Sequence, residues 1–231
     1  MTITPTRFTV ELPDGPLALP GAAPEVWMAG AREYPAASRV DVLDEGERRR
    51  AATFVRDADR ELYTVAHVAL RMLLGRYLAA DPAELALTRL ACPGCGEPHG
   101  RPAVEGVPLH FSLSHSDGTA VLAFASLPVG ADVERLPEER VVGDVAPHLH
   151  PREAAELSAL DDSARPGGFA RVWARKEAYV KGLGIGLARG LDRDYVGSGP
   201  VPHSPSGWRI TDVAVPDTHR AAVATAVAGG W

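Results

Sequence analysis

The sequence predicts an α+β fold made of two halves that meet near residues 126–130. Two observations support this prediction. Helix-like and strand-like runs alternate on both sides of that boundary. Each half also contains one long helix-like run, over residues 62–77 in the first half and roughly 168–182 in the second.

In the first half, strand-like runs at residues 7–12 and 25–29 are interrupted by proline and glycine turns. The pattern becomes helical from Asp44, and apolar residues then recur at helical spacing until Asp81-Pro82 ends the run. Residues 91–108 are rich in Gly, Pro and Cys, so we expect an irregular connection there.

Three strand-like runs surround the boundary, at residues 109–115, 119–126 and 129–134. The residues between the first two runs, 116–118, end in Asp-Gly, which favours a tight hairpin turn. We therefore expect a hairpin followed by a third strand.

In the second half, Pro151 begins a short helix, and the Pro- and Gly-rich segment 165–168 separates it from the longer one. We expect three glycines to end the longer helix and two strands to complete the half. The glycines are Gly182, Gly184 and Gly186, and the strands lie at residues 208–216 and 220–228.

Length and composition limit the class of protein. The 231 residues suit one large domain or two of about 100–130 residues each. No run approaches the roughly 20 apolar residues that cross a bilayer, and the N-terminus lacks a signal-peptide pattern. We therefore expect a cytoplasmic protein without a membrane partner. The net charge of −6 also disfavours nucleic acid as a partner, so an anionic ligand needs a local basic patch.

Asp132 and Glu134 lie two residues apart at the end of a strand-like run, where side chains at i and i+2 share a face. Paired carboxylates repel each other unless a cation or a proton lies between them. The pair is either a solvated strand end or part of a site for a hard divalent ion such as Mg²⁺.

Trp173, Glu177 and Lys181 are spaced four apart and therefore share one face of the longer helix. An exposed Glu–Lys pair would explain two of them, but a large aromatic on the same face predicts partial burial. A metal for Glu177 and a phosphate for Lys181 would then supply the partners that buried charges need. The other charges of this helix, Arg175 and Lys176, lie off that face and need no catalytic role.

Other polar residues could bind an anion. Ser114 and His115 lie at the end of a strand-like run, where they either belong to a polar turn or bind phosphate. Because neighbours on a strand point to opposite faces, they do not form a nucleophilic pair. Arg101 lies in a rigid Gly-Arg-Pro turn. A run of arginines upstream is by default a solvated helix surface: Arg48, Arg49, Arg50, Arg56, Arg60 and Arg71. Within it, the cluster Arg48–Arg60 is the best candidate for an anion-docking patch of this acidic chain.

Cys92 and Cys95 are too close in sequence to define a disulfide framework. With His99 they form half of a zinc ligand set, but a second Cys/His pair at good spacing is missing. Zinc binding therefore stays open, and free cysteines are the favoured interpretation.

Together, three ordered segments resemble the motifs of the Sfp-type 4′-phosphopantetheinyl transferases, approximately F-x-x-S-H-S, G-I/V-D-I/V-E and W-x-x-K-E-A-x-x-K. The segments are FSLSHS at 111–116, GADVE at 130–134 and WARKEAYVK at 173–181. Upstream, residues 52–60 and 99–102 also resemble the N-terminal pattern of the family. Ala131 departs from the pattern, which usually has Ile or Val there. Because it points away from the carboxylates, we expect this change to affect packing more than chemistry.

The resemblance implies a pseudo-dimer of two similar α/β halves, residues 1–127 and 128–231, with the active site in the cleft between them. The first half would contact the nucleotide, and the second would carry the metal and catalytic residues. It further implies Mg²⁺-dependent transfer of the 4′-phosphopantetheine arm of coenzyme A to a serine of an acyl or peptidyl carrier protein. Adenosine 3′,5′-bisphosphate would be released, and a monomer is expected.

The resemblance also implies residue roles. Asp132, Glu134 and Glu177 would bind magnesium, and Glu177 would accept the proton of the carrier serine, directly or through a water. Lys181 would contact the pyrophosphate and stabilise charge on the departing nucleotide. Trp173 would fix the Glu177–Lys181 face by packing. The expected nucleotide contacts are Arg48, Arg60, Ser114 and His115 at the 3′-phosphate and Arg101 elsewhere.

Two other functions fit the same residues. A Mg²⁺-dependent phosphohydrolase or nuclease could use the three carboxylates, although a nuclease would be expected to show a broad basic face that this acidic chain lacks. A binding module that has lost activity is the third possibility, and the presence of all three carboxylates disfavours it.

Overall fold

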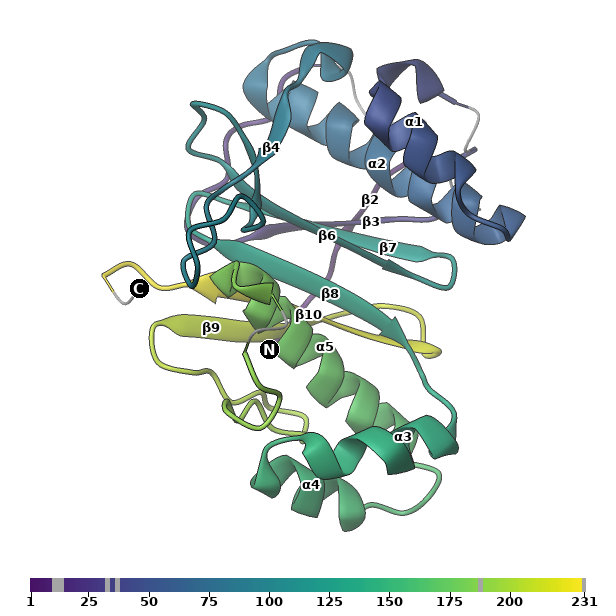
Figure 1. The fold of residues 1–231 in the computed structure, drawn as a ribbon, viewed down its shortest axis with the longest axis vertical. Coiled ribbons are helices and arrows are strands. Elements are labelled where there is room, and N and C mark those ends of the chain that lie inside the picture. Colours follow the sequence, from purple (N-terminus) through teal and green to yellow (C-terminus); the bar gives the residue numbers. More distant parts are fainter. Residues whose placement is uncertain (10–14, 32–33, 36–37, 187–188, 230–231) are drawn as a thin grey trace.

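A computed structural model describes residues 1–9, 15–31, 34–35, 38–186 and 189–229. The fold is mixed α+β, as the sequence predicts, with two four-stranded sheets lying between two groups of helices (Figure 1). No helix in the described part of the chain has the length and apolarity needed to cross a membrane.

The first sheet has the strand order β2–β3–β7–β6. Its strands are β2 (Thr6–Arg7), β3 (Glu25–Ala29), β6 (His110–Ser116) and β7 (Thr119–Ala125). β6 and β7 form an antiparallel hairpin joined by Asp117 and Gly118. Both turn residues have positive φ, 37° and 83°, as a type I′ two-residue turn requires. The predicted hairpin is therefore confirmed.

The second sheet has the order β1–β9–β10–β8. Its strands are β1 (Thr2–Ile3), β8 (Val129–Arg135), β9 (Trp208–Val213) and β10 (His219–Ala226). β1 pairs in parallel with β9, whereas the other pairs are antiparallel. The first residues of the chain thus belong to the sheet formed by its last strands, which the sequence patterns did not indicate.

One long helix covers each sheet (Figure 1). α2 (Asp57–Leu78) and the first sheet share one apolar core, and α5 (Arg165–Leu183) and the second sheet share another. Small and β-branched side chains from both sheets form a third cluster, which includes the fully buried Ala131. The departure of Ala131 from the family pattern therefore lies at the contact between the sheets, and its expected effect on packing stays a prediction.

Shorter elements complete the fold. Of two short paired strands, β4 (Leu87–Arg89) precedes the region expected to be irregular, 91–108, and β5 (Pro102–Val104) lies inside it. The helices α1 (Glu45–Ala52) and α4 (Pro151–Ser158) agree with the helical patterns. The remaining described elements are α3 (Glu139–Val145) and the 3₁₀ turns η1 (Val40–Val42), η2 (Pro82–Glu84) and η3 (Ala146–His148).

Two predictions about the ends of α5 are wrong. The segment 165–168 does not separate helices but forms the first turn of α5, where Pro166 loses no intrahelical hydrogen bond. Gly182 does not end the helix, because it lies inside α5, where an added Cβ would come within 2.5 Å of the Trp208 ring. Gly184, with φ 76°, is the residue that caps the helix.

Two charged residues of α5 are buried in the structure. The guanidinium of Arg175 is bidentate to Asp212 on β9, with nitrogen–oxygen distances of 2.7 and 2.6 Å. The Lys176 ammonium lies 2.8 Å from Glu153 on α4. These ion pairs join α5 to its neighbours. Both charges therefore have a structural role, in agreement with the expectation that they need no catalytic one.

We predict that Arg175→Met lowers the free energy of unfolding by about 3–5 kcal/mol, because it leaves Asp212 and two backbone carbonyls without their buried partner. Urea denaturation measures the change. The matched control is Arg140→Met, which removes an exposed pair with Asp144 and should cost less than about 1 kcal/mol. Equal losses for the two variants would contradict a stabilising role for Arg175.

Candidate active site

A cleft of about 720 Å³ lies between α2, the loop at residues 98–102, β6 and α5. Four of the predicted site residues line it: Arg101, His115, Glu177 and Lys181. They come from segments far apart in sequence, so the fold brings these candidates to one surface.

Asp132 lies on β8 with 2% of its side chain exposed. Its Oδ1 accepts hydrogen bonds from Ser114 Oγ at 2.8 Å and from Lys181 Nζ at 2.6 Å. Lys181 Nζ also donates to Ser114 Oγ at 3.0 Å. Asp132 Oδ2, however, is buried and has no hydrogen-bond partner in the described residues. A buried carboxylate oxygen without a partner is free to coordinate a cation.

The two other predicted metal ligands are partly buried near Asp132. Burial, followed by repulsion from Asp132, raises the pKa of Glu134 to about 7. Burial and then the charge of Asp132 also raise the pKa of Glu177. Clustered acids with this behaviour fit a hard divalent cation, which would favour their charged forms. The carboxyl oxygens of Asp132, Glu134 and Glu177 do not all lie within 4.8 Å of one another. Among the described residues, the only group of three or more potential ligands that close together is Cys92, Cys95 and His99.

Trp173 is half-buried and stacks on Phe169, with ring centroids 5.8 Å apart. Both rings line a second, smaller groove of about 190 Å³, to which Glu134 also contributes. Trp173 is therefore packed, but its predicted role in fixing the Glu177–Lys181 face stays a prediction, because those two residues line the larger cleft instead.

The strand β6 presents alternate residues to different neighbours. Ser112, Ser114 and Ser116 all hydrogen-bond to β8, through the Ala131 amide, the Asp132 carboxylate and the Arg135 amide. This bridging between the two sheets was missed, although the period of two in SLSHS places the hydroxyls on one face. Ser114 thus holds Asp132, and its predicted contact with the nucleotide stays a prediction.

His115 points the other way, into the cleft, and packs edge-on against Tyr63 at 6.1 Å. Burial, together with the nearby His67 and Lys181 charges, lowers the pKa of His115. A neutral imidazole can donate one hydrogen bond to an anion and can gain a proton when an anion binds.

Arg101 connects the loop after β4 to the end of α5. Its Nη1 donates to the carbonyls of Gly182 at 3.0 Å and Leu183 at 3.1 Å. Burial lowers the pKa of Arg101, and its Nε has no partner in the described part of the chain. The guanidinium is therefore held at the cleft through Nη1, whereas its buried Nε has no partner among the described residues.

Arg48 and Arg60 do not line the cleft. Arg48 is exposed on α1, and Arg60 pairs with Asp57 and donates to the Phe54 carbonyl at 3.2 Å. Their contacts with a nucleotide phosphate therefore stay a prediction.

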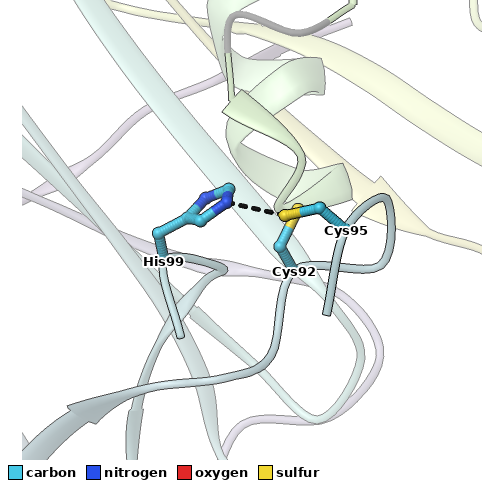
Figure 2. A group of neighbouring side chains, drawn as sticks. All are labelled: Cys92, Cys95 and His99. Carbon is cyan, nitrogen blue, oxygen red and sulfur yellow. Dashed lines mark hydrogen bonds between the residues drawn. The ribbon is translucent and has the colours of Figure 1, made fainter. Parts of the chain in front are cut away.

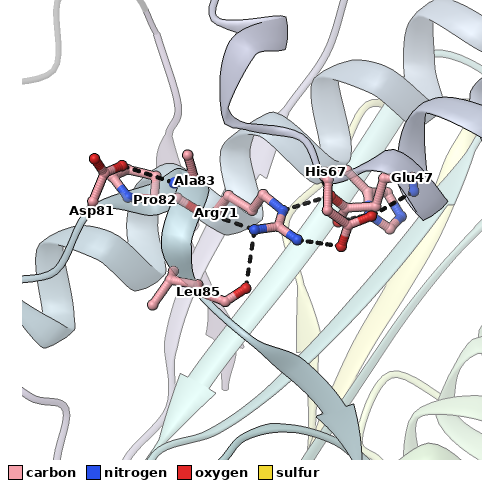
Figure 3. A network of polar contacts seen from close by, with 8 residues as sticks. Glu47, His67, Arg71, Asp81, Pro82, Ala83 and Leu85 are labelled. Carbon is pink, nitrogen blue, oxygen red and sulfur yellow. Dashed lines mark hydrogen bonds and ion pairs between the residues drawn. The ribbon is translucent and has the colours of Figure 1, made fainter.

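A buried polar network borders the cleft (Figure 3). Arg71 is fully buried, and its guanidinium contacts Glu47 Oε2 at 2.5 Å and Asp44 Oδ2 at 2.6 Å. Glu47 Oε1 lies 2.9 Å from His67 Nδ1. One interpretation of the arginine run places it on a solvated helix surface. For Arg71 this interpretation is wrong, because the side chain is fully buried. Part of this network leaves a signal in the sequence. Asp44 and Glu47 form a capping box, whose D-x-x-E spacing marks the start of a helix.

A family model for the 4′-phosphopantetheinyl transferase superfamily matches residues 128–209. The chain is 31% identical to 4′-phosphopantetheinyl transferase HetI from Nostoc sp. over 202 residues, which covers 82% of this chain and 80% of the relative. The chain belongs to the 4′-phosphopantetheinyl transferase superfamily. It is also 25% identical to 4′-phosphopantetheinyl transferase Sfp from Bacillus subtilis over 148 residues, 63% of this chain and 62% of that protein. The predicted family and type of enzyme are confirmed.

We predict that Glu47→Gln destabilises this transferase by about 1–3 kcal/mol at pH 7, because it weakens the buried contacts with Arg71 and His67. Although burial opposes the effect, hydrogen bonds from His67, the Asp44 amide and Arg71 hold the pKa of Glu47 below its usual value. A carboxyl with a lowered pKa contributes stability that is present above its unfolded pKa and is lost as pH falls through its folded pKa. The deficit of the variant should therefore shrink below about pH 4.5.

Denaturation of both proteins in urea between pH 3 and 7 measures this dependence. Glu45→Gln, on the exposed face of the same helix, is the control. A deficit that is independent of pH, or no larger than that of the control, would show that the ionised form of Glu47 does not stabilise the fold.

Proposed function

We propose that this transferase moves the 4′-phosphopantetheine arm of coenzyme A to a serine hydroxyl of an acyl or peptidyl carrier protein. The bond from the serine oxygen to the β-phosphorus forms as the bond to the leaving phosphate breaks, and adenosine 3′,5′-bisphosphate leaves. The observation that carries the proposal is the placement of Glu177 and Lys181 on one cleft wall, with Asp132 in contact with Lys181.

The cleft suits a substrate of this kind. Its volume of about 720 Å³ lies within the range of sites for small molecules and cofactors. Arg101, His115 and Lys181 contribute cationic or hydrogen-bonding groups to its wall, which can bind phosphates although the chain is acidic overall.

Asp132, Glu134 and Glu177 are the residues that would hold Mg²⁺, consistent with the partnerless Oδ2 of Asp132 and the raised pKa values of both glutamates. Bound magnesium would supply charge neutralisation at the pyrophosphate. In this proposal Glu177 accepts the proton of the carrier serine, directly or through water. Lys181 contacts the pyrophosphate and offsets charge on the leaving nucleotide.

The same proposal describes the fold as two similar halves, residues 1–127 and 128–231, with the active site between them. Support comes from the two four-stranded sheets, each covered by one long helix, although β1 pairs outside its own half. Because both halves belong to one chain, the proposal includes a monomer, and it places the enzyme in the cytoplasm.

We predict that Glu177→Gln lowers kcat by about 10²–10⁴-fold, because the amide cannot take up the serine proton. Intact-mass analysis of apo-carrier proteins incubated with coenzyme A and Mg²⁺, with and without chelator, follows the gain of one phosphopantetheine arm. Glu105→Gln, an exposed loop residue, is the control and should leave the rate unchanged.

Two outcomes would contradict this scheme. Hydrolysis of coenzyme A without modification of any carrier would favour the phosphohydrolase alternative. Unchanged turnover by Glu177→Gln would remove Glu177 from proton transfer, and Mg²⁺-stimulated turnover by Asp132→Ala would remove Asp132 from the metal site.

We predict that Arg60→Ala raises KM for coenzyme A more than KM for dephospho-coenzyme A, since only the first carries the 3′-phosphate assigned to Arg60. Loss of a charged hydrogen bond corresponds to roughly 10-fold or more in KM. Steady-state kinetics with both substrates, and with the exposed Arg209→Ala as control, measure the ratio. Equal changes for both substrates would contradict the assignment.

A further inference from the structure

A second group of side chains, which the proposed transfer reaction does not use, lies in the loop between β4 and β5. The potential ligand atoms of Cys92, Cys95 and His99 all lie within 4.8 Å of one another. Cys95 Sγ is 3.0 Å from His99 Nε2 (Figure 2). The sequence favours free cysteines, because a second Cys/His pair at good spacing is missing, but the structure brings His99 onto both sulfur atoms.

The backbone of this loop is arranged to present the three side chains to one point. The Cys92 amide donates to the Glu97 carbonyl at 2.8 Å, and the Gly96 amide donates to the Cys92 carbonyl at 2.8 Å. The His99 amide also donates to Glu97, at 2.8 Å, and Gly96 has a φ of 80° that favours glycine. Two turns in succession therefore bring both sulfur atoms and the imidazole together before any ligand binds.

Backbone N–H groups surround the sulfur of Cys92. Those of Gly94 and Cys95 point at its Sγ. The thiolate is the form that binds metal ions. Cys92 is also buried, whereas Cys95 and His99 are open to an incoming ion.

We propose that Cys92, Cys95 and His99 bind one Zn²⁺ ion through two Sγ atoms and Nε2. Two thiolates and an imidazole are preferred zinc ligands, and the C-x-x-C spacing is common in structural zinc sites. Both thiols lose their protons on binding, so the charges of the ion and the two thiolates cancel. Water takes the fourth tetrahedral position, because the described residues add no further Cys, His, Asp or Glu to the group.

The site lies next to the cleft. His99 itself lines the cleft, and Arg101, two residues on, binds the carbonyls at the end of α5. The Leu90 amide donates to the Arg101 carbonyl at 2.9 Å, and the Gly100 amide donates to Leu90 at 2.9 Å, which closes the base of the loop. A zinc ion would therefore restrict the loop that holds Arg101 in place. This consequence for coenzyme A rests on the proposed function, but the zinc site does not.

Metal content tests the proposal directly. Protein produced in zinc-supplemented medium and purified under reducing conditions without chelator should carry about one zinc ion per chain by elemental mass spectrometry. Cys95→Ser and His99→Asn should reduce the zinc content at least tenfold. The matched control, His148→Asn, replaces an exposed histidine outside the group and should retain the zinc of the wild type. Wild-type protein without zinc, or variants that keep it, would overturn the proposal.

Cobalt titration of the metal-free wild-type protein provides a readout that does not depend on variants folding. Co²⁺ should produce sulfur-to-cobalt charge-transfer bands and the intense visible bands of a tetrahedral site, and zinc should abolish both. Failure of these bands to appear would overturn the proposal. A wild-type chain lacking zinc and two hydrogen masses lighter than its reduced form would also overturn it, because the cysteines would then form a disulfide.

Hydrogen exchange separates this proposal from the proposed function. Amides of residues 92–101 should exchange more slowly in zinc-loaded than in zinc-free protein, without any substrate present. Unchanged exchange would overturn the claim that the ion restricts the loop. Because neither coenzyme A nor a carrier is added, failure of the transferase assay would leave the exchange result unaffected. Unchanged exchange would likewise leave the transferase assay unaffected.

Discussion

A close backbone approach between α5 and β8 sets the geometry of the candidate site. An added Cβ at Gly130 would lie 2.0 Å from the Ala178 carbonyl oxygen, and one at Gly182 would collide with the Trp208 ring of β9. Glycine at 130 therefore lets the helix lie this close to β8, and glycine at 182 leaves room for Trp208. Asp132 is two residues beyond Gly130 and Lys181 is next to Gly182, so this contact brings the carboxylate and the ammonium within 2.6 Å.

That approach places like charges in a partly buried region, which has an energetic cost. The raised pKa values of Glu134 and Glu177 reflect this cost, because burial and the charge of Asp132 disfavour their ionised forms. Asp132, in contrast, accepts hydrogen bonds from Lys181 and Ser114. Ser114 reaches Asp132 because the serines of β6 bridge the two sheets. The residues of the site therefore depend on two contacts, helix to strand and sheet to sheet, and both use small side chains.

Much of this arrangement could be predicted from sequence, because periodicity reports which residues share an element and a face. The hairpin of β6 and β7, the long helices, and the common face of Trp173, Glu177 and Lys181 follow from local patterns. Pairings between distant segments could not be predicted. The partners of β1 and Arg71 lie far away in sequence, and no local pattern records them. Gly182 was misjudged for the same reason, since a glycine that permits close packing has the same sequence signal as one that ends a helix.

The charges of α5 show why burial has to be known before a charged residue is given a role. Arg175 and Lys176 are more deeply buried than Lys181, yet each has a carboxylate partner fixed by tertiary structure, so their charges are already neutralised. Lys181 is 34% exposed and shares Asp132 with Ser114 at the edge of a cleft. A fully paired, enclosed ion contributes to stability and has no site left for a ligand, whereas a partly exposed one can exchange its partner. On one helix, the same residue types therefore divide into structural and ligand-binding groups according to whether solvent, and hence substrate, can reach them.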